Sequence, residues 1–181
     1  MNDSFHIIEI LRDGISSFSS RKKKFKYLLF IPLIIVVPAV EFFNLSIDSD
    51  STNTLISSLS IFTGFFFTLI IYVADKANNK KRDLKLSIQE EDQRLLKRYL
   101  DFTENLIIQI SFSIVLSIII IFILMFSQID FNQFSELKEI SFWLKKILDT
   151  MVFYCVVVLL IYLLLIVSNM YAVLLHEVND D

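Results

Sequence analysis

The chain has 181 residues, of which 55% are hydrophobic, and its formal net charge is -3. A soluble globular domain does not combine this apolar fraction with a mean hydropathy of +0.62, so the composition excludes that class and favours an integral membrane protein. The single Cys155 excludes an internal disulfide and any paired-cysteine metal or redox motif. We expect one all-α membrane domain, residues 21–181, after a separate N-terminal segment, residues 1–20.

The N-terminal segment carries apolar side chains at helical spacing, among them Phe5, Ile8 and Leu11, with charged residues between them. This pattern predicts a short amphipathic helix that lies on a membrane surface. A basic cluster follows it. The cluster either attracts anionic lipid or serves only as an orientation signal, which is the commoner role. These membrane-surface residues are Arg21, Lys22, Lys23, Lys24 and Lys26.

Four apolar stretches are long enough to cross a bilayer, whose core needs about 20 residues and accepts as few as about 17. They cover residues 27–43, 55–74, 106–127 and 151–175, and none alternates apolar with polar residues as a membrane strand would. We therefore predict four transmembrane helices. In the first, Pro32 and Pro38 predict a bend, and Glu41 lies near the end, where it can reach the interface.

Positive charges are distributed unequally between the two sides of these spans. Of the 17 Lys and Arg residues, only Lys138, Lys145 and Lys146 fall between the third and fourth spans, and none falls between the first and second. Because basic residues stay on the cytoplasmic side, both termini and the central loop are predicted to be cytoplasmic. The predicted localisation is a cytoplasmic (inner) membrane that the chain crosses several times.

Small and polar side chains recur at helical spacing on one face of the second span and on one face of the third. Small residues let helices approach closely in lipid, so these faces are candidates for helix packing within or between subunits. The alternative is that they line a hydrated pore in an oligomer. The two ladders are Ser57, Ser60, Gly64 and Thr68 in the second span, and Asn105, Gln109, Ser113 and Ser117 in the third.

The central loop contains the largest predicted cytoplasmic element. Ser87 and Glu90 have the spacing of a capping box, and no Gly or Pro interrupts the sequence from there to Ser127. With the second span continuing to about Leu86, residues 75–105 are predicted to form a cytoplasmic helical hairpin. Its apolar stripe either packs on the hairpin itself or docks a soluble partner. This partner or oligomer face consists of Ile88, Leu95, Tyr99 and Phe102.

Residues 132–147, between the third and fourth spans, combine an apolar face with aromatic side chains. We predict an interfacial helix on the outer leaflet, anchored at headgroup level by Phe131, Phe134 and Trp143. Asp149, at the end of this segment, is within reach of Lys145 or Lys146 for an ion pair.

Residues suited to catalysis are scarce. His176 precedes Glu177 but has no second histidine at metal-binding spacing, and Gly14 and Gly64 cannot form a phosphate-binding loop. The central loop interleaves its basic residues with acids, which argues against nucleic-acid binding. We therefore predict no catalytic residue, no metal site, no cofactor, no enzymatic activity and no direct nucleic-acid contact.

The chain resembles the membrane subunits of bacterial antiphage defence systems, in particular those of the Kiwa system. The resemblance rests on the four-span layout, on residues 60–67 (SIFTGFFF) ahead of Asp75 and Lys76, and on the charged central loop before the third span. It implies a homo-oligomeric sensor of envelope disturbance in the bacterial inner membrane, which engages a cytoplasmic DNA-binding effector.

From the residues themselves, the leading hypothesis is a non-enzymatic membrane sensor or scaffold that contacts lipid, oligomerises and recruits a soluble cytoplasmic effector. Two alternatives belong to other classes. One is a small oligomeric pore or membrane-disrupting effector, and the other is an accessory or immunity subunit of a membrane transporter.

Overall fold

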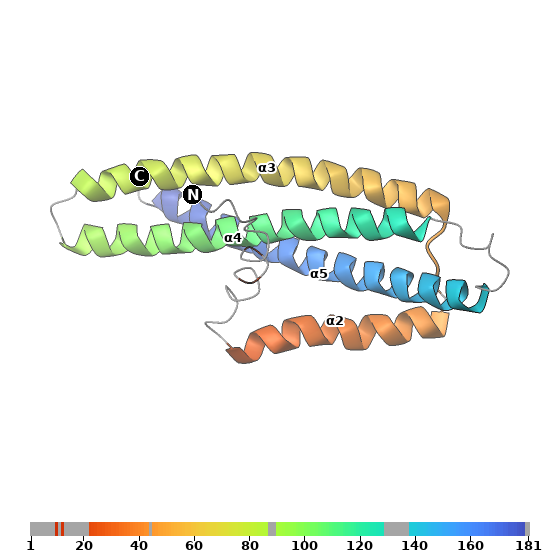
Figure 1. Ribbon diagram of the computed structural model, residues 1–181. Helices are drawn as coiled ribbons and strands as arrows, with labels where there is room; N and C mark the ends of the chain where they lie inside the picture. The colour runs from red at the N-terminus through yellow and green to blue at the C-terminus, as the bar shows by residue number, and fades with distance from the viewer. Residues whose placement is uncertain are drawn as a thin grey trace, which may run out of the picture. The chain divides into compact units, whose positions relative to one another are not determined.

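The structure is a computed structural model that describes residues 10, 12, 22–43, 45–86, 90–128 and 138–179. This described part consists of helices and short connections (Figure 1). Its four long helices are α2 (Lys22–Phe43), α3 (Ser49–Leu86), α4 (Glu90–Ser127) and α5 (Lys138–Asn179). The predicted all-α class is therefore confirmed. Of the predicted N-terminal segment, only Ile10 and Arg12 are described, and both are helical.

Three stretches of these helices are long and apolar enough to cross a membrane: Ser49–Arg82 of α3, Leu96–Ser127 of α4 and Phe142–Tyr171 of α5. The described apolar part of α2 is shorter and runs Phe30–Phe43. Large apolar side chains are exposed on all four helices, for example Ile34, Ile61, Phe122 and Leu164. Such wide apolar exposure is unfavourable in water and normal in lipid. Length, composition and exposure together indicate a membrane protein.

The fourth helix begins earlier than the sequence suggested. We predicted an interfacial helix over 132–147 and a separate span from 151, but Lys138–Asn179 is one continuous helix of 42 residues. Residues 129–137, which include Phe131 and Phe134, lie outside the described part. The polar stretch from Lys145 to Asp149 does not break α5, because it contains no Gly or Pro, and Lys146 and Asp149 have partners outside the helix.

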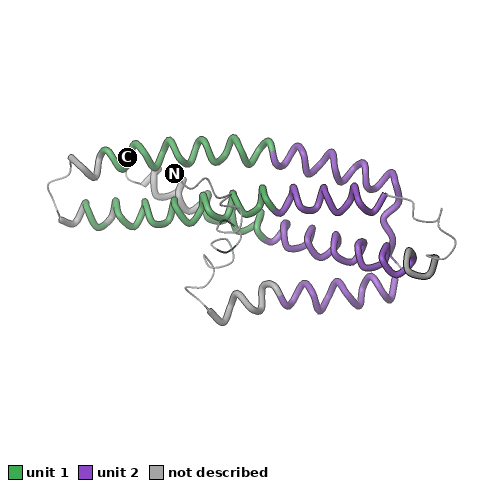
Figure 2. Tube along the Cα trace, in the orientation of Figure 1, with its two compact units in different colours: residues 1–20, 64–115, 162–181 green, residues 21–63, 116–161 purple. Residues whose placement is uncertain are grey.

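Contacts divide the chain into two compact units (Figure 2). Unit 1 takes its helices from Gly64–Val115 and Tyr162–Asp181, and unit 2 takes its helices from Arg21–Thr63 and Leu116–Ile161. Thus α3, α4 and α5 contribute to both units, whereas α2 belongs to unit 2.

The core is supplied mainly by α4 and α5. In the most apolar window of α4, 50% of the residues are buried, against 11% in α3. Within unit 1, the fully buried Leu106 and Ile110 accompany the stacked rings of Phe112 and Tyr162, whose centroids lie 4.6 Å apart. Unit 2 buries another set of apolar side chains, among them Val40, Ile120, Leu124 and Val152. Most of the α3 surface is therefore left uncovered by the described chain.

Candidate functional site

Ionisable and amide side chains within apolar helices are the natural place to look for function, because lipid does not compensate them. Two polar contacts between residues far apart in sequence join α5 to the region of α2 within unit 2. We call their members, Glu41, Lys146, Ile47 and Asp149, the Asp149 cluster.

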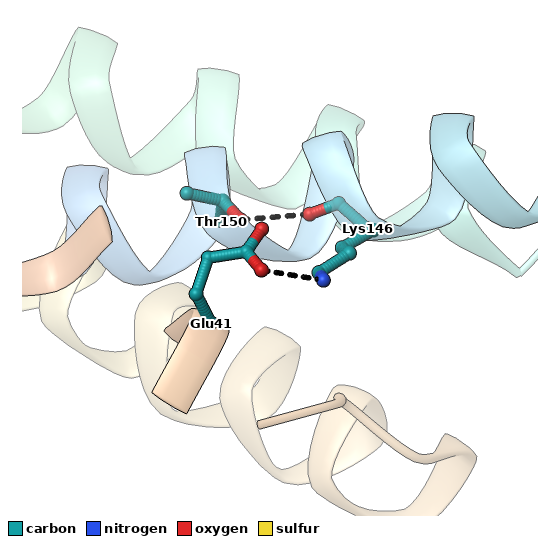
Figure 3. Close-up of polar contacts among 3 residues, drawn as sticks. All are labelled: Glu41, Lys146 and Thr150. Atoms are coloured by element: carbon teal, nitrogen blue, oxygen red, sulfur yellow. Dashed lines mark hydrogen bonds and ion pairs between the residues drawn. The ribbon is translucent and has the colours of Figure 1, made fainter. Parts of the chain in front are cut away.

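The first contact of the Asp149 cluster is an ion pair. Lys146 Nζ donates to Glu41 Oε2 at 2.7 Å (Figure 3). Glu41 is 56% exposed and Lys146 is 23% exposed. The Lys146 backbone carbonyl accepts a 2.8 Å hydrogen bond from Thr150 Oγ1, and Lys146 Nζ lies 5.9 Å from the centre of the Trp143 ring. The Lys146 side chain of α5 thus pairs with an acid from α2.

The second contact of the Asp149 cluster is buried. Asp149 lies three residues further along α5 and is only 3% exposed. The Ile47 backbone N–H donates to Asp149 Oδ2 over 3.4 Å, which is long for such a bond. Asp149 Oδ1 is also buried, and the described residues supply it with no hydrogen-bond partner. A buried carboxylate with one weak donor is energetically costly, so this group requires an explanation.

The connection between α2 and α3 presents the Ile47 N–H because both flanking helix ends are capped. Leu45 N donates to Val40 O at 3.2 Å, a six-to-one bond that closes the end of α2. Asp48 caps α3: its Oδ1 accepts from Ser51 N at 2.9 Å, and its carbonyl accepts from Thr52 N at 2.9 Å. Ile47 and Thr52 are both buried. The two caps therefore leave little freedom in the connection.

Hydrogen bonds from the side chain and backbone of Ser51 lower the pKa of Asp48. The ionised Asp48 therefore contributes its full stabilisation of the folded protein above the ordinary aspartate pKa of about 3.9. This contribution is lost as the pH falls through the lowered pKa of Asp48. On acidification through this range, we expect the melting temperature of the wild type to decrease more than that of Asp48→Asn. The asparagine amide also caps a helix, but it does not titrate. Circular dichroism melts in detergent measure the difference, and equal pH profiles would contradict the role of Asp48.

A third polar contact lies in unit 1 and joins α4 to α5. Asn169 Nδ2 donates to Gln109 Oε1 at 2.9 Å, and Ser113 Oγ donates to the Gln109 carbonyl at 2.9 Å. Gln109 and Ser113 are buried. Hydrogen bonds between membrane helices contribute about 0.6–2 kcal/mol each. The sequence singled out Gln109 but missed Asn169, although Asn169 is the only amide in the predicted span 151–175.

The ladder on α3 is exposed along its length. Ser57 Oγ, Ser60 Oγ and Thr68 Oγ1 donate to carbonyls one turn earlier in the same helix, over 2.9, 2.8 and 3.2 Å. A Cβ added to Gly64 would meet no atom within 4 Å beyond its own surroundings. The described chain therefore leaves this face of α3 uncovered, with its hydroxyl donors already satisfied.

The ladder on α4 is mostly buried. Asn105 is exposed and donates to the Asp101 carbonyl at 2.8 Å, whereas Gln109, Ser113 and Ser117 are all buried. The two ladders thus differ in environment: the ladder on α3 is exposed, and the ladder on α4 is mostly buried.

The remaining predicted site residues are described only in part. On the partner face, Tyr99 and Phe102 are half-buried, and Lys80 Nζ lies 5.8 Å from the centre of the Tyr99 ring. Trp143 is exposed, and its ring lies 6.2 Å from that of Phe142. The residues and side chains that lie outside the described part are Arg21, Ile88, Phe131 and Phe134, and the side chains of Lys22, Lys23, Lys24, Lys26, Leu95 and His176.

No group of three or more His, Cys, Asp or Glu among the described residues is placed to hold a metal ion. No protein-family model, curated protein or solved structure matched the chain.

Proposed function

We propose that the protein is a non-enzymatic membrane scaffold or sensor that oligomerises through α3 and recruits a soluble partner at a cytoplasmic hairpin formed by α3 and α4. The uncovered face of α3 carries this proposal. Small residues drive helix association in lipid by allowing close backbone approach, and the Ser60–Gly64–Thr68 stretch is open to a neighbouring helix. The low burial of α3, compared with α4, leaves room for a second copy.

Enlarging a small residue on α3 tests the proposed interface. We expect Gly64→Leu to reduce the mass of the complex extracted in mild detergent, because the leucine side chain would hold the neighbouring backbone away. Helicity should stay unchanged, since an added Cβ meets nothing within the chain. Val167→Leu, at an exposed position of α5, is the matched control. A wild-type monomer, or a Gly64→Leu complex of unchanged mass, would contradict oligomerisation through α3.

The length of α3 and α4 supports the cytoplasmic hairpin. Each has 38 residues, which at about 1.5 Å per residue is well beyond a bilayer core of about 30 Å. The contact between Lys80 and Tyr99 joins the parts of α3 and α4 on either side of the central connection. The basic residues of this region favour its cytoplasmic location. Phe102→Glu should therefore reduce copurification of a soluble partner more than it reduces assembly of the protein itself.

Labelling of single cysteines tests the proposed orientation. In a Cys155→Ser background, we expect a membrane-impermeant maleimide to label Leu45→Cys on intact spheroplasts, and to label Lys81→Cys only after the membrane is opened. Both positions are exposed, so access to the reagent depends on the side of the membrane. The reverse labelling pattern would overturn the orientation with both termini and the hairpin in the cytoplasm.

The proposal that the partner is an antiphage effector rests on the sequence resemblance alone. The pore hypothesis is less well supported than the scaffold. The α3 hydroxyls donate to their own helix, and most of the α4 ladder is buried within one chain, so few described polar groups are free to line an aqueous channel. Ion flux across the membrane of liposomes that contain the purified protein would support the pore hypothesis.

A further inference from the structure

We propose that Asp149 is a proton-binding site: its carboxyl group takes up a proton on Oδ1 when the α2–α3 connection packs on α5, and releases it when that contact opens. This inference is independent of the proposed oligomer and of the proposed soluble partner. It concerns only the Asp149 cluster within unit 2.

The first argument is the hydrogen-bond supply at the two carboxyl oxygens. An ionised carboxylate has about four acceptor positions to satisfy. Asp149 receives one donor, the Ile47 N–H, over a long 3.4 Å, and its buried Oδ1 receives none from the described residues. Burying a neutral acid costs far less than burying a charge. A proton on Oδ1 therefore removes the main cost of the packed arrangement, and Oδ2 continues to accept from Ile47.

The second argument concerns the charged side chains near Asp149, none of which fully compensates an ionised carboxylate there. On α5, Lys146 is already paired with Glu41 of α2. Lys145 is exposed, so water and salt screen its charge. In the connection and at the start of α3, Asp48 and Asp50 are acidic and exposed, so they supply Asp149 with no compensating positive charge. The part of α4 that belongs to unit 2 has no ionisable side chain in its described residues, 116–128.

Proton binding and packing are therefore linked. When the connection leaves α5, the Asp149 carboxyl gains water and has the proton affinity of an ordinary aspartate. The packed state binds the proton more tightly, so acidification favours the packed connection and alkalinity favours release. Because Ile47 is joined directly to the Asp48 cap of α3, opening would free the start of α3 from α5. The site thus gives unit 2 a response to pH.

Infrared spectroscopy of the reconstituted full-length protein tests the proton directly. At neutral pH we expect a carbonyl band of a protonated carboxylic acid, shifted by aspartate-specific carbon-13 labelling and absent in Asp149→Asn. Glu104→Gln, at an exposed acid of unit 1, is the control and should keep the band. Absence of the band from the wild type at neutral pH would overturn the proposal. The labelled wild type gives this answer even if the Asp149→Asn variant does not accumulate.

A distance measurement tests the link to packing. Spin labels at Leu45→Cys in the connection and Leu160→Cys on α5, both exposed and both in unit 2, report the contact in a Cys155→Ser background. We expect a distance distribution that broadens as the pH rises in the wild type and stays narrow in Asp149→Asn, whose neutral side chain keeps an acceptor for Ile47. An identical pH response in the two proteins would overturn the linkage.

Discussion

Replacing Tyr162 by alanine is expected to destabilise the protein more than any other single change considered for unit 1. The Tyr162 side chain is only 2% exposed, and its ring stacks on Phe112 at a centroid distance of 4.6 Å. Removing a buried aromatic ring leaves a cavity that its neighbours fill only in part, which costs about 3–5 kcal/mol in soluble proteins. Lipid is itself apolar, so the part of this cost that comes from moving a side chain out of water is reduced. The part that comes from lost packing contacts remains.

Tyr171→Ala is the matched control, because Tyr171 lies in the same helix and in the same unit but is 64% exposed. Unfolding of each variant in mixed micelles, followed by circular dichroism, gives the two changes in the free energy of unfolding. The α4–α5 core of unit 1 predicts a large effect at Tyr162 and a small one at Tyr171. Equal effects at the two positions would contradict it.

Reversing the charge of Lys146 is expected to destabilise the packing of α2 on α5. Losing an exposed ion pair costs about 0.2–1 kcal/mol. Lys146→Glu goes further, because it places two acids at the site of a 2.7 Å contact and adds a negative charge three residues from the buried Asp149. Like charges held in this geometry repel each other. The exposure of Glu41 allows it to turn away into solvent, which limits the penalty.

The reciprocal exchange provides the internal control for this prediction. Glu41→Lys alone should also destabilise, whereas the double variant Glu41→Lys with Lys146→Glu restores an attractive pair and should recover much of the loss. A double-mutant cycle of unfolding free energies isolates the coupling between the two side chains. Additive effects, with no recovery in the double variant, would contradict a direct ion pair between α2 and α5.

Helix content and apolar character could be predicted because they depend on neighbouring residues. Uninterrupted apolar runs predicted an all-α membrane protein with four spans. The structure confirms the all-α fold and has three stretches long and apolar enough to cross a membrane. The continuation of the second span to about Leu86 was predicted, and α3 ends at Leu86. The long third helix was predicted from the absence of Gly and Pro up to Ser127, and α4 ends at Ser127. The start of α5 was not predicted, because Lys145, Lys146 and Asp149 resembled a polar boundary. The structure shows that Lys146 and Asp149 have partners on α2 and in the connection.

The candidate sites were only partly accessible to sequence reasoning. Glu41 was predicted to reach the interface, and its partner Lys146 was considered only for Asp149. The sequence around Asp149 has no pattern that indicates whether this acid is buried or exposed. Gln109 was found through its ladder, whereas its partner Asn169 stands alone in its span.

The sequence by itself determined the class of the protein and the positions of its apolar helices, because hydropathy and internal backbone hydrogen bonding act within one segment of chain. It also supports a prediction of orientation from the distribution of basic residues. Only the tertiary structure decided that Asp149 is buried beside Ile47, that Glu41 meets Lys146, and that the α4 ladder is covered while the α3 ladder is open. Burial and long-range pairing depend on which helices meet, and residues separated by more than 100 positions have no local pattern that reveals their contact.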